Sequence, residues 1–212
     1  MPTELTAPQI LEAAGEVFAE KGYKDATVRE ICSRADVNLA AINYHFGDKE
    51  RLYLESVKNA RRLIEADVPL PDWQDDTTAD EKLESFVFTL VRRLFNPRSA
   101  PWQHRLILRE IMEPSKACEE MVQESFAPFV DRLRQIISEM TNDSLPRHKL
   151  QQLCFSVIGQ CVYYRAHERV VEMMVSATDR KKHFRPDELA AHITQFSIAA
   201  IKAFAPAKTK KL

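Results

Sequence analysis

The chain has 212 residues, 45% of them apolar, and a formal net charge of −1, so it can form a real core but shows no overall attraction for nucleic acid. Only four glycines and many Ala, Leu, Glu, Arg and Lys residues favour helices throughout. No apolar run approaches the roughly 20 residues that span a bilayer, and residues 1–9 lack signal-peptide features, so we expect a cytoplasmic protein with no membrane partner.

Three short helices are predicted in the first fifty residues, at about 6–21, 27–35 and 39–46. Thr27 opens the second helix with the capping-box sequence TVRE, and Asn38 caps the third. Two short helices joined by a three-residue turn have the proportions of a helix-turn-helix.

The third helix is too short to persist in water without packing partners. We expect Ile42 and Phe46 to join a small core with the second helix, which leaves the other face outward. In a helix-turn-helix, the start of the second helix meets base edges in the major groove. Asn43 offers a paired donor and acceptor, and Tyr44 and His45 can reach bases or phosphates.

The helix starts at Thr27 and Lys49 are suited to phosphate groups, because unpaired amide groups and the helix dipole attract anions there. Thr27, Arg29 and Lys49 add side-chain donors at these points. One observation opposes this interpretation: residues 1–64 carry nine Lys or Arg against ten Asp or Glu.

The remainder is also predicted to be helical. Asp48 caps a bridging helix at 49–66, and an acidic, proline-containing connector follows at 68–80. Further helices are predicted at about 78–94, 101–112, 117–141, 146–175 and 187–204. We therefore predict an all-α fold with a helix-turn-helix domain at 1–50, a ligand-binding and dimerisation domain at 51–205 and a basic tail at 206–212.

The segment TVREICSRADVNLAAINYHFGDKERLYLESV resembles the DNA-binding segment of TetR-type transcriptional repressors, and NYHFGDKE is its most specific part. The resemblance covers about residues 8–60. It departs from the family at Asp36, where glycine is usual, and at Ala41, where Ser or Thr is common. Transferred position by position, and with the cap Asn38 added, it implies that these residues face operator DNA: Thr27, Arg29, Asn38, Leu39, Ala40, Ala41, Asn43, Tyr44, His45 and Lys49.

The stretches LREIMEPS and FSVIGQCVYYRAH resemble the ligand-binding half of the CecR-like branch of this family. This second resemblance implies a homodimer with a small-molecule cavity in each subunit. Together the two resemblances imply a repressor without a cofactor, which binds double-stranded, palindromic operator DNA and releases it when an effector moves the bridging helix.

Candidate effector contacts are aromatic and polar side chains on the later helices. Such side chains could equally be core or solvent-facing, so we single out Arg109, Gln160 and Tyr164, whose polar tips lie in largely apolar stretches. The predicted effector contacts are Phe88, Arg92, Arg109, Phe126, Phe155, Gln160, Tyr163 and Tyr164.

Segments 151–175 and 187–204 are apolar on more than one side. They could form a deep core within one subunit or a four-helix interface between two subunits, and we favour the dimer because a single reading helix rarely gives enough affinity.

Enzyme chemistry finds little support in the sequence. His167-Glu168 lacks the second histidine of a zinc hydrolase motif, and no Gly-rich phosphate loop or GxSxG elbow is present. The four cysteines have no metal-ligand spacing. Cys32, Cys154 and Cys161 fall within predicted helices, so we interpret the cysteines as buried thiols in a reducing compartment. The alternative function is a helical ligand-binding or scaffold protein that has lost DNA affinity.

Overall fold

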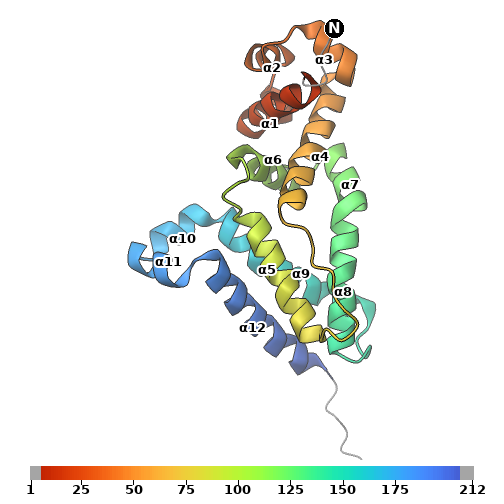
Figure 1. Ribbon diagram of the computed structural model, residues 1–212, viewed down its shortest axis with the longest axis vertical. Coiled ribbons are helices and arrows are strands. Elements are labelled where there is room, and N and C mark those ends of the chain that lie inside the picture. The colour runs from red at the N-terminus through yellow and green to blue at the C-terminus, as the bar shows by residue number, and fades with distance from the viewer. Residues whose placement is uncertain (1–5, 206–212) are drawn as a thin grey trace, which may run out of the picture. The chain divides into compact units, whose positions relative to one another are not determined.

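The computed structural model describes residues 6–205, and the regular elements in that range are helices (Figure 1). The predicted all-α fold is thus confirmed, while the predicted basic tail lies outside the described residues. The elements are α1 (Thr6–Asp25), α2 (Val28–Ala35), α3 (Leu39–Phe46), α4 (Lys49–Asp67), α5 (Ala79–Leu94), α6 (Pro101–Met112), α7 (Lys116–Met121), the π-helical turn η1 (Val122–Phe126), α8 (Ala127–Met140), α9 (Arg147–Ala166), α10 (Glu168–Met174), α11 (Ala177–His183) and α12 (Pro186–Phe204).

Most helix starts follow from local capping. Asn38 Oδ1 accepts the Ala41 amide at 2.9 Å, and Asp48 Oδ1 accepts the Arg51 amide at 2.8 Å. At Thr78, both halves of a capping box are present with Glu81. These contacts join residues three apart, which is why the sequence could predict them.

Two long predicted helices are interrupted. The segment predicted as one helix at about 117–141 is divided by η1, because Pro128 lacks the amide that would continue an α-helical ladder. The segment predicted at 146–175 is divided at His167, whose φ of −114° and ψ of 26° leave the helical range. The prediction of uninterrupted helices was wrong at both places.

The short helix α11 was not predicted. Ser176 accepts the Asp179 amide at 3.1 Å and donates its hydroxyl to the Asp179 carboxylate at 2.7 Å. This Ser-x-x-Asp capping signal was visible in the sequence, but no apolar stripe follows it.

The chain forms two compact units, each built from two separate segments. The first unit combines residues up to Asp67 with Pro97–Ser125, and the second combines Val68–Asn96 with residues from Phe126 onward. Helices α6 and α7 thus belong to the same unit as α1–α4. The predicted functional boundary near residue 50 remains a proposal.

In the first unit, α6 packs closely on α1. The Trp102 ring lies over Gly15, where an added Cβ would come within 2.2 Å of the indole. Near the end of α1, Gly22 adopts a φ of 76°, and Arg109 occupies the space that a Cβ would need. The indole contact requires glycine at position 15, and the positive φ favours it at position 22, where the flexible Arg109 side chain could shift.

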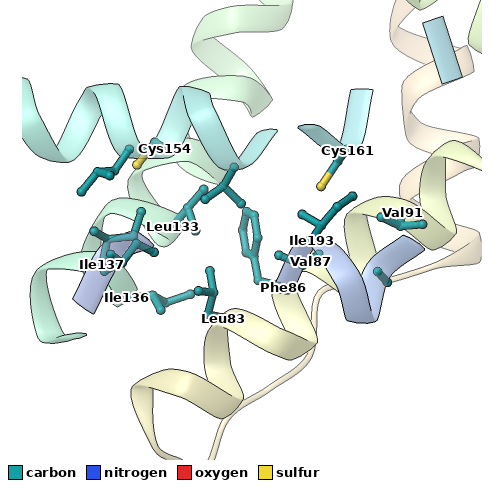
Figure 2. Packing of buried hydrophobic residues seen from close by; sticks show 14 of the residues in the cluster. Leu83, Phe86, Val87, Val91, Leu133, Ile136, Ile137, Cys154, Cys161 and Ile193 are labelled. Atoms are coloured by element: carbon teal, nitrogen blue, oxygen red, sulfur yellow. The ribbon is translucent and has the colours of Figure 1, made fainter. Parts of the chain in front are cut away.

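The second unit has its own core, formed by α5, α8, α9 and α12 (Figure 2). Phe86 of α5 is fully buried, and its ring centroid lies 4.3 Å from that of Phe129 on α8. Aliphatic side chains from the neighbouring helices surround it, among them Leu133, Ile137 and Ile193.

Candidate nucleic-acid interface

Helix α3 has a buried side and an outward side. Ile42 is fully buried, while Leu39 is 55% and Tyr44 77% exposed. Ala40 and Asn43 are also exposed. The outward side of this helix therefore offers an amide, a phenol and small residues, with one apolar side chain at its start.

The ten predicted DNA-facing residues belong to the first unit and differ in exposure. Seven are exposed, and the three others are half-buried. The exposed ones are Thr27, Arg29, Asn38, Leu39, Ala40, Asn43 and Tyr44, and the half-buried ones are Ala41, His45 and Lys49. The ring of His45 lies edge-on to Tyr44, with centroids 5.0 Å apart.

The turn between α2 and α3 depends on Asp36. This residue has a φ of 50° and a ψ of 46°, the left-handed conformation that glycine adopts most readily. Its amide and that of Val37 both donate to the Cys32 carbonyl, which closes the end of α2. Asp36 thus replaces the expected glycine without opening the turn.

We call α1–α3 and the first turn of α4 the head. Several of its acidic side chains form ion pairs with basic side chains of the same unit. Arg34 donates two hydrogen bonds of 3.1 Å to the Glu20 carboxylate and lies 3.5 Å from Glu16, and these contacts hold the pKa of Glu20 below its usual value. Lys21 pairs with Glu30 at 2.7 Å. Glu30 is the last residue of the predicted capping box at Thr27. Its amide donates to Thr27 at 3.3 Å, but its carboxylate pairs with Lys21, so only one half of that box is found. Each of these pairs neutralises a base together with an acid, so the nearly balanced charge of residues 1–64 still speaks against strong long-range attraction to DNA.

Lys49 lies where α1 ends and α4 begins. Its ammonium group lies 4.7 Å from the centroid of the Tyr23 ring and donates to the Lys24 carbonyl at 3.4 Å. The caps at Thr27 and Asp48 each accept one first-turn amide, at Glu30 and Arg51. Phosphate binding at these two helix starts remains a prediction.

The predicted effector contacts differ in exposure and in their partners. In the second unit, Phe88 and Phe126 are half-buried, Phe155 and Tyr163 are exposed, and the Gln160 amide donates to the Ser156 carbonyl of its own helix. Arg92 pairs with Asp187 at 3.4 Å, and Arg109 lies in the first unit against Gly22.

Tyr164, one of the predicted effector contacts, lines a hollow. This hollow, of about 170 Å³, is formed with Phe95 and Phe184 among others in the second unit. The assignment of effector contacts remains a prediction.

Sequence reasoning missed the residues that hold the head together. Tyr53 of α4 is 5% exposed, contacts the rings of Phe18 and Tyr23 and donates its hydroxyl to Glu110 of α6. A tyrosine at a core-facing position of the bridging helix was the available signal. Nothing in the sequence marked Glu110 as buried.

Among residues 6–205, no helix is both long and apolar enough to cross a membrane. Within the same range, no three His, Cys, Asp or Glu side chains come together as ligands for a metal ion.

Two family models match the chain. The model described as "Bacterial regulatory proteins, tetR family" matches residues 10–55. The model described as "HTH-type transcriptional dual regulator CecR, C-terminal domain" matches residues 79–201, more than half of the chain. The first match contains the whole of α2 and α3, and the second covers most of the later helices.

Curated relatives share these two parts to different extents. The dual regulator CecR of Shigella flexneri is 25% identical over 177 residues, which cover 79% of this chain and 79% of CecR. The regulator SrpR of Pseudomonas putida is 26% identical over 69% of this chain, which spans 64% of SrpR. The repressor AcnR of Corynebacterium efficiens is 45% identical over 58 residues, 27% of this chain and 31% of AcnR.

The fold is also found in solved structures. A regulatory protein of the TetR family from Rhodococcus RHA1 matches with a TM-score of 0.70, at 21% identity, over 94% of this chain and 98% of that protein.

Proposed function

Because the chain belongs to the TetR family of bacterial transcriptional regulators, we propose that it binds a palindromic operator as a homodimer and releases it when a small molecule binds. The observation that supports this most is the outward side of α3, where Asn43 and Tyr44 are exposed beside the buried Ile42. An amide can bind an adenine edge with two hydrogen bonds, and a phenol can bind a base or a phosphate.

Phosphate contacts at the flanks support the same function. Arg29 and Lys49 lie at the starts of α2 and α4, where the helix dipoles favour anions. Each such contact fixes the register of the head on the duplex without selecting sequence. Two heads related by a two-fold axis would double these contacts and read two half-sites about one helical turn apart or somewhat more.

A dimer is supported by apolar side chains on α9 and α12. Phe155 is 60% exposed and Tyr163 48% on α9, and Phe196 is 57% and Phe204 47% on α12. Four exposed aromatic side chains on two helices exceed what scattered surface residues explain. We propose that these helices form a four-helix interface with their partners.

Repression is proposed by analogy with AcnR, which is named as a repressor and is 45% identical over 58 residues. For the effector we propose a site in the second unit, with the predicted contacts Phe88, Arg92, Phe126, Gln160 and Tyr164 as candidates and Arg109 as a candidate in the first unit. Phe155 and Tyr163, also predicted as effector contacts, are assigned to the dimer interface instead.

Selection of bound sequences from random duplex DNA by the purified protein tests the operator proposal. We expect a palindrome whose affinity falls as salt rises, because bound Lys and Arg release counterions from DNA. Isolation of an unrelated pool at low salt would refute sequence-specific binding and favour a helical ligand-binding protein instead.

A further inference from the structure

Glu110, in the last turn of α6, is a carboxylate with 0% exposure. It accepts hydrogen bonds from four donors of the first unit. One oxygen accepts the Ser115 amide and hydroxyl, each at 2.6 Å, and the Cys118 amide at 3.0 Å, while the other accepts the hydroxyl of Tyr53. The side chain therefore joins the corner between α6 and α7 to the bridging helix α4.

A buried carboxylate is costly unless hydrogen bonds replace its lost hydration. Hydrogen bonds to an ionised acceptor are about twice as strong as those between neutral groups. All four donors point to the same carboxylate, so a glutamine amide could not accept them equally well, because its NH2 group would face a donor. The position thus requires an acid.

Tyr53 extends this contact towards the DNA-facing surface. Its ring lies 4.9 Å from that of Phe18 and 5.2 Å from that of Tyr23, both on α1. Burial raises the pKa of Tyr53, so its hydroxyl stays a donor. Tyr23 in turn lies under the ammonium group of Lys49. A continuous series of contacts thus links Glu110 to a predicted phosphate contact.

Other polar contacts described between α4 and α7 or η1 are more exposed ion pairs. Lys116 pairs with Glu50 at 2.8 Å, with side chains 79% and 57% exposed, and Lys58 pairs with Glu120 at 2.7 Å and Glu124 at 2.9 Å. Exposed pairs contribute little to stability and weaken with salt. A hollow of about 580 Å³ lies beside this corner, with Tyr53 and Ser115 in its lining.

We propose that Glu110 is a positioning residue for DNA binding: through Tyr53 it fixes the direction of α4, and with it the placement of Lys49 and the DNA-facing residues of the head. The proposal rests on the proposed function, because it concerns how the head meets an operator. The hydrogen bond from Tyr53 to Glu110, which we call the tether, does not involve DNA and can be measured alone.

A matched pair of variants separates this role from simple stabilisation. Tyr53→Phe removes the donor on α4 and leaves the three donors of the corner. Ser115→Ala removes one donor of the corner together with the cap on the Ala117 amide, and leaves the contact to α4. Each variant deletes one hydroxyl bonded to the same carboxylate, so a purely structural role predicts an effect of Ser115→Ala at least as large as that of Tyr53→Phe.

The first readout is the spacing preference of the full-length protein on operators with one base pair inserted or removed between half-sites. We expect Tyr53→Phe to reduce the preference for the selected spacing by about tenfold, since a lost charge-assisted hydrogen bond is large enough for that change. Ser115→Ala should retain the preference of the unmodified protein. The second readout, hydrogen–deuterium exchange without DNA, should rise in residues 49–57 for Tyr53→Phe and only in residues 115–121 for Ser115→Ala.

An unchanged spacing preference in Tyr53→Phe would overturn the proposal. So would an equal loss of preference in Ser115→Ala, because the stability of the corner would then explain both results. If no protein binds an operator, exchange decides: faster exchange in α4 of Tyr53→Phe alone would retain the tether while its role in DNA binding fails with the proposed function. Unchanged exchange in α4 would remove the tether as well.

Discussion

At the scale of single residues, Tyr44 is the clearest test of the DNA-facing surface. Its side chain is 77% exposed and contributes little to the core, so Tyr44→Ala should leave thermal stability unchanged. We expect operator affinity to fall by about tenfold or more, as the loss of one good base or phosphate contact does. Fluorescence anisotropy with labelled operator measures the change.

Ile42→Asp is the control for that variant, because it places a charge at a fully buried position of the same helix and should unfold the head. If Tyr44→Ala bound the operator as tightly as the unmodified protein, Tyr44 would not belong to the reading surface.

The cysteines give a second residue-scale prediction. Burial raises the pKa of Cys154 to about 11 and that of Cys161 to about 12, since it disfavours the charged thiolate. The thiolate is the reactive form, so neither side chain should be alkylated by iodoacetamide in the folded protein at about pH 8. Mass spectrometry of labelled peptides checks this, with the protein in guanidinium as the reference. Labelling of either thiol in the folded protein at the rate seen in guanidinium would contradict its burial.

At the scale of elements, local signals predicted the helix starts and missed the breaks. Asn38 and Thr78 cap their helices by contacts to residues three positions away. Asp36 adopts the left-handed conformation, which aspartate tolerates better than most residues. By contrast, the burial of Glu110 depends on Tyr53, a residue far away in sequence. No periodicity encodes such a long-range contact, so the polar centre of the first unit could not be predicted.

The contact between α4 and the helix formed by α7 and η1 should depend on salt and pH. Glu120 and Glu124 raise the pKa of Lys58, and Lys58 lowers the pKa of Glu124. A lysine whose pKa is raised by folding stabilises the fold at pH values below its unfolded-state pKa. This stabilisation is lost as the pH rises through its folded-state pKa. A glutamate whose pKa is lowered by folding stabilises the fold at pH values above its unfolded-state pKa. This stabilisation is lost as the pH falls through its folded-state pKa.

Lys58→Gln should therefore lower the melting temperature at neutral pH and low salt, and this difference should shrink in acid, in strong base and in concentrated salt. Differential scanning fluorimetry across pH and salt measures it. Arg62→Gln is the control, because Arg62 is exposed and bonds to Asn59 of its own helix. Equal salt dependence of both variants would mean that the ion pairs of Lys58 do not matter.

At the scale of the whole molecule, Gly159 tests the proposed dimer. It lies on the exposed side of α9, one turn from both Phe155 and Tyr163, and an added Cβ would meet nothing within 4 Å in its own subunit. Gly159→Leu should leave the subunit folded but obstruct close approach of a partner helix. We expect the dimer dissociation constant to rise by at least about tenfold.

Analytical ultracentrifugation measures that constant. Glu84→Leu adds the same side chain at an exposed position of α5 and should leave the dimer intact. A Gly159→Leu protein that associates as tightly as this control would place the interface elsewhere.

The division of the first unit into two chain segments sets the order in which it can mature during synthesis. Residues up to Asp67 leave the ribosome first, but Trp102, which covers Gly15, and Glu110, which holds Tyr53, follow only with Pro97–Ser125. At about 5–20 residues per second, this second segment arrives some seconds after the first. A nascent chain therefore contains α3 before it contains the contacts of α6 with α1 and α4. Translation that stops before residue 97 leaves the head without α6.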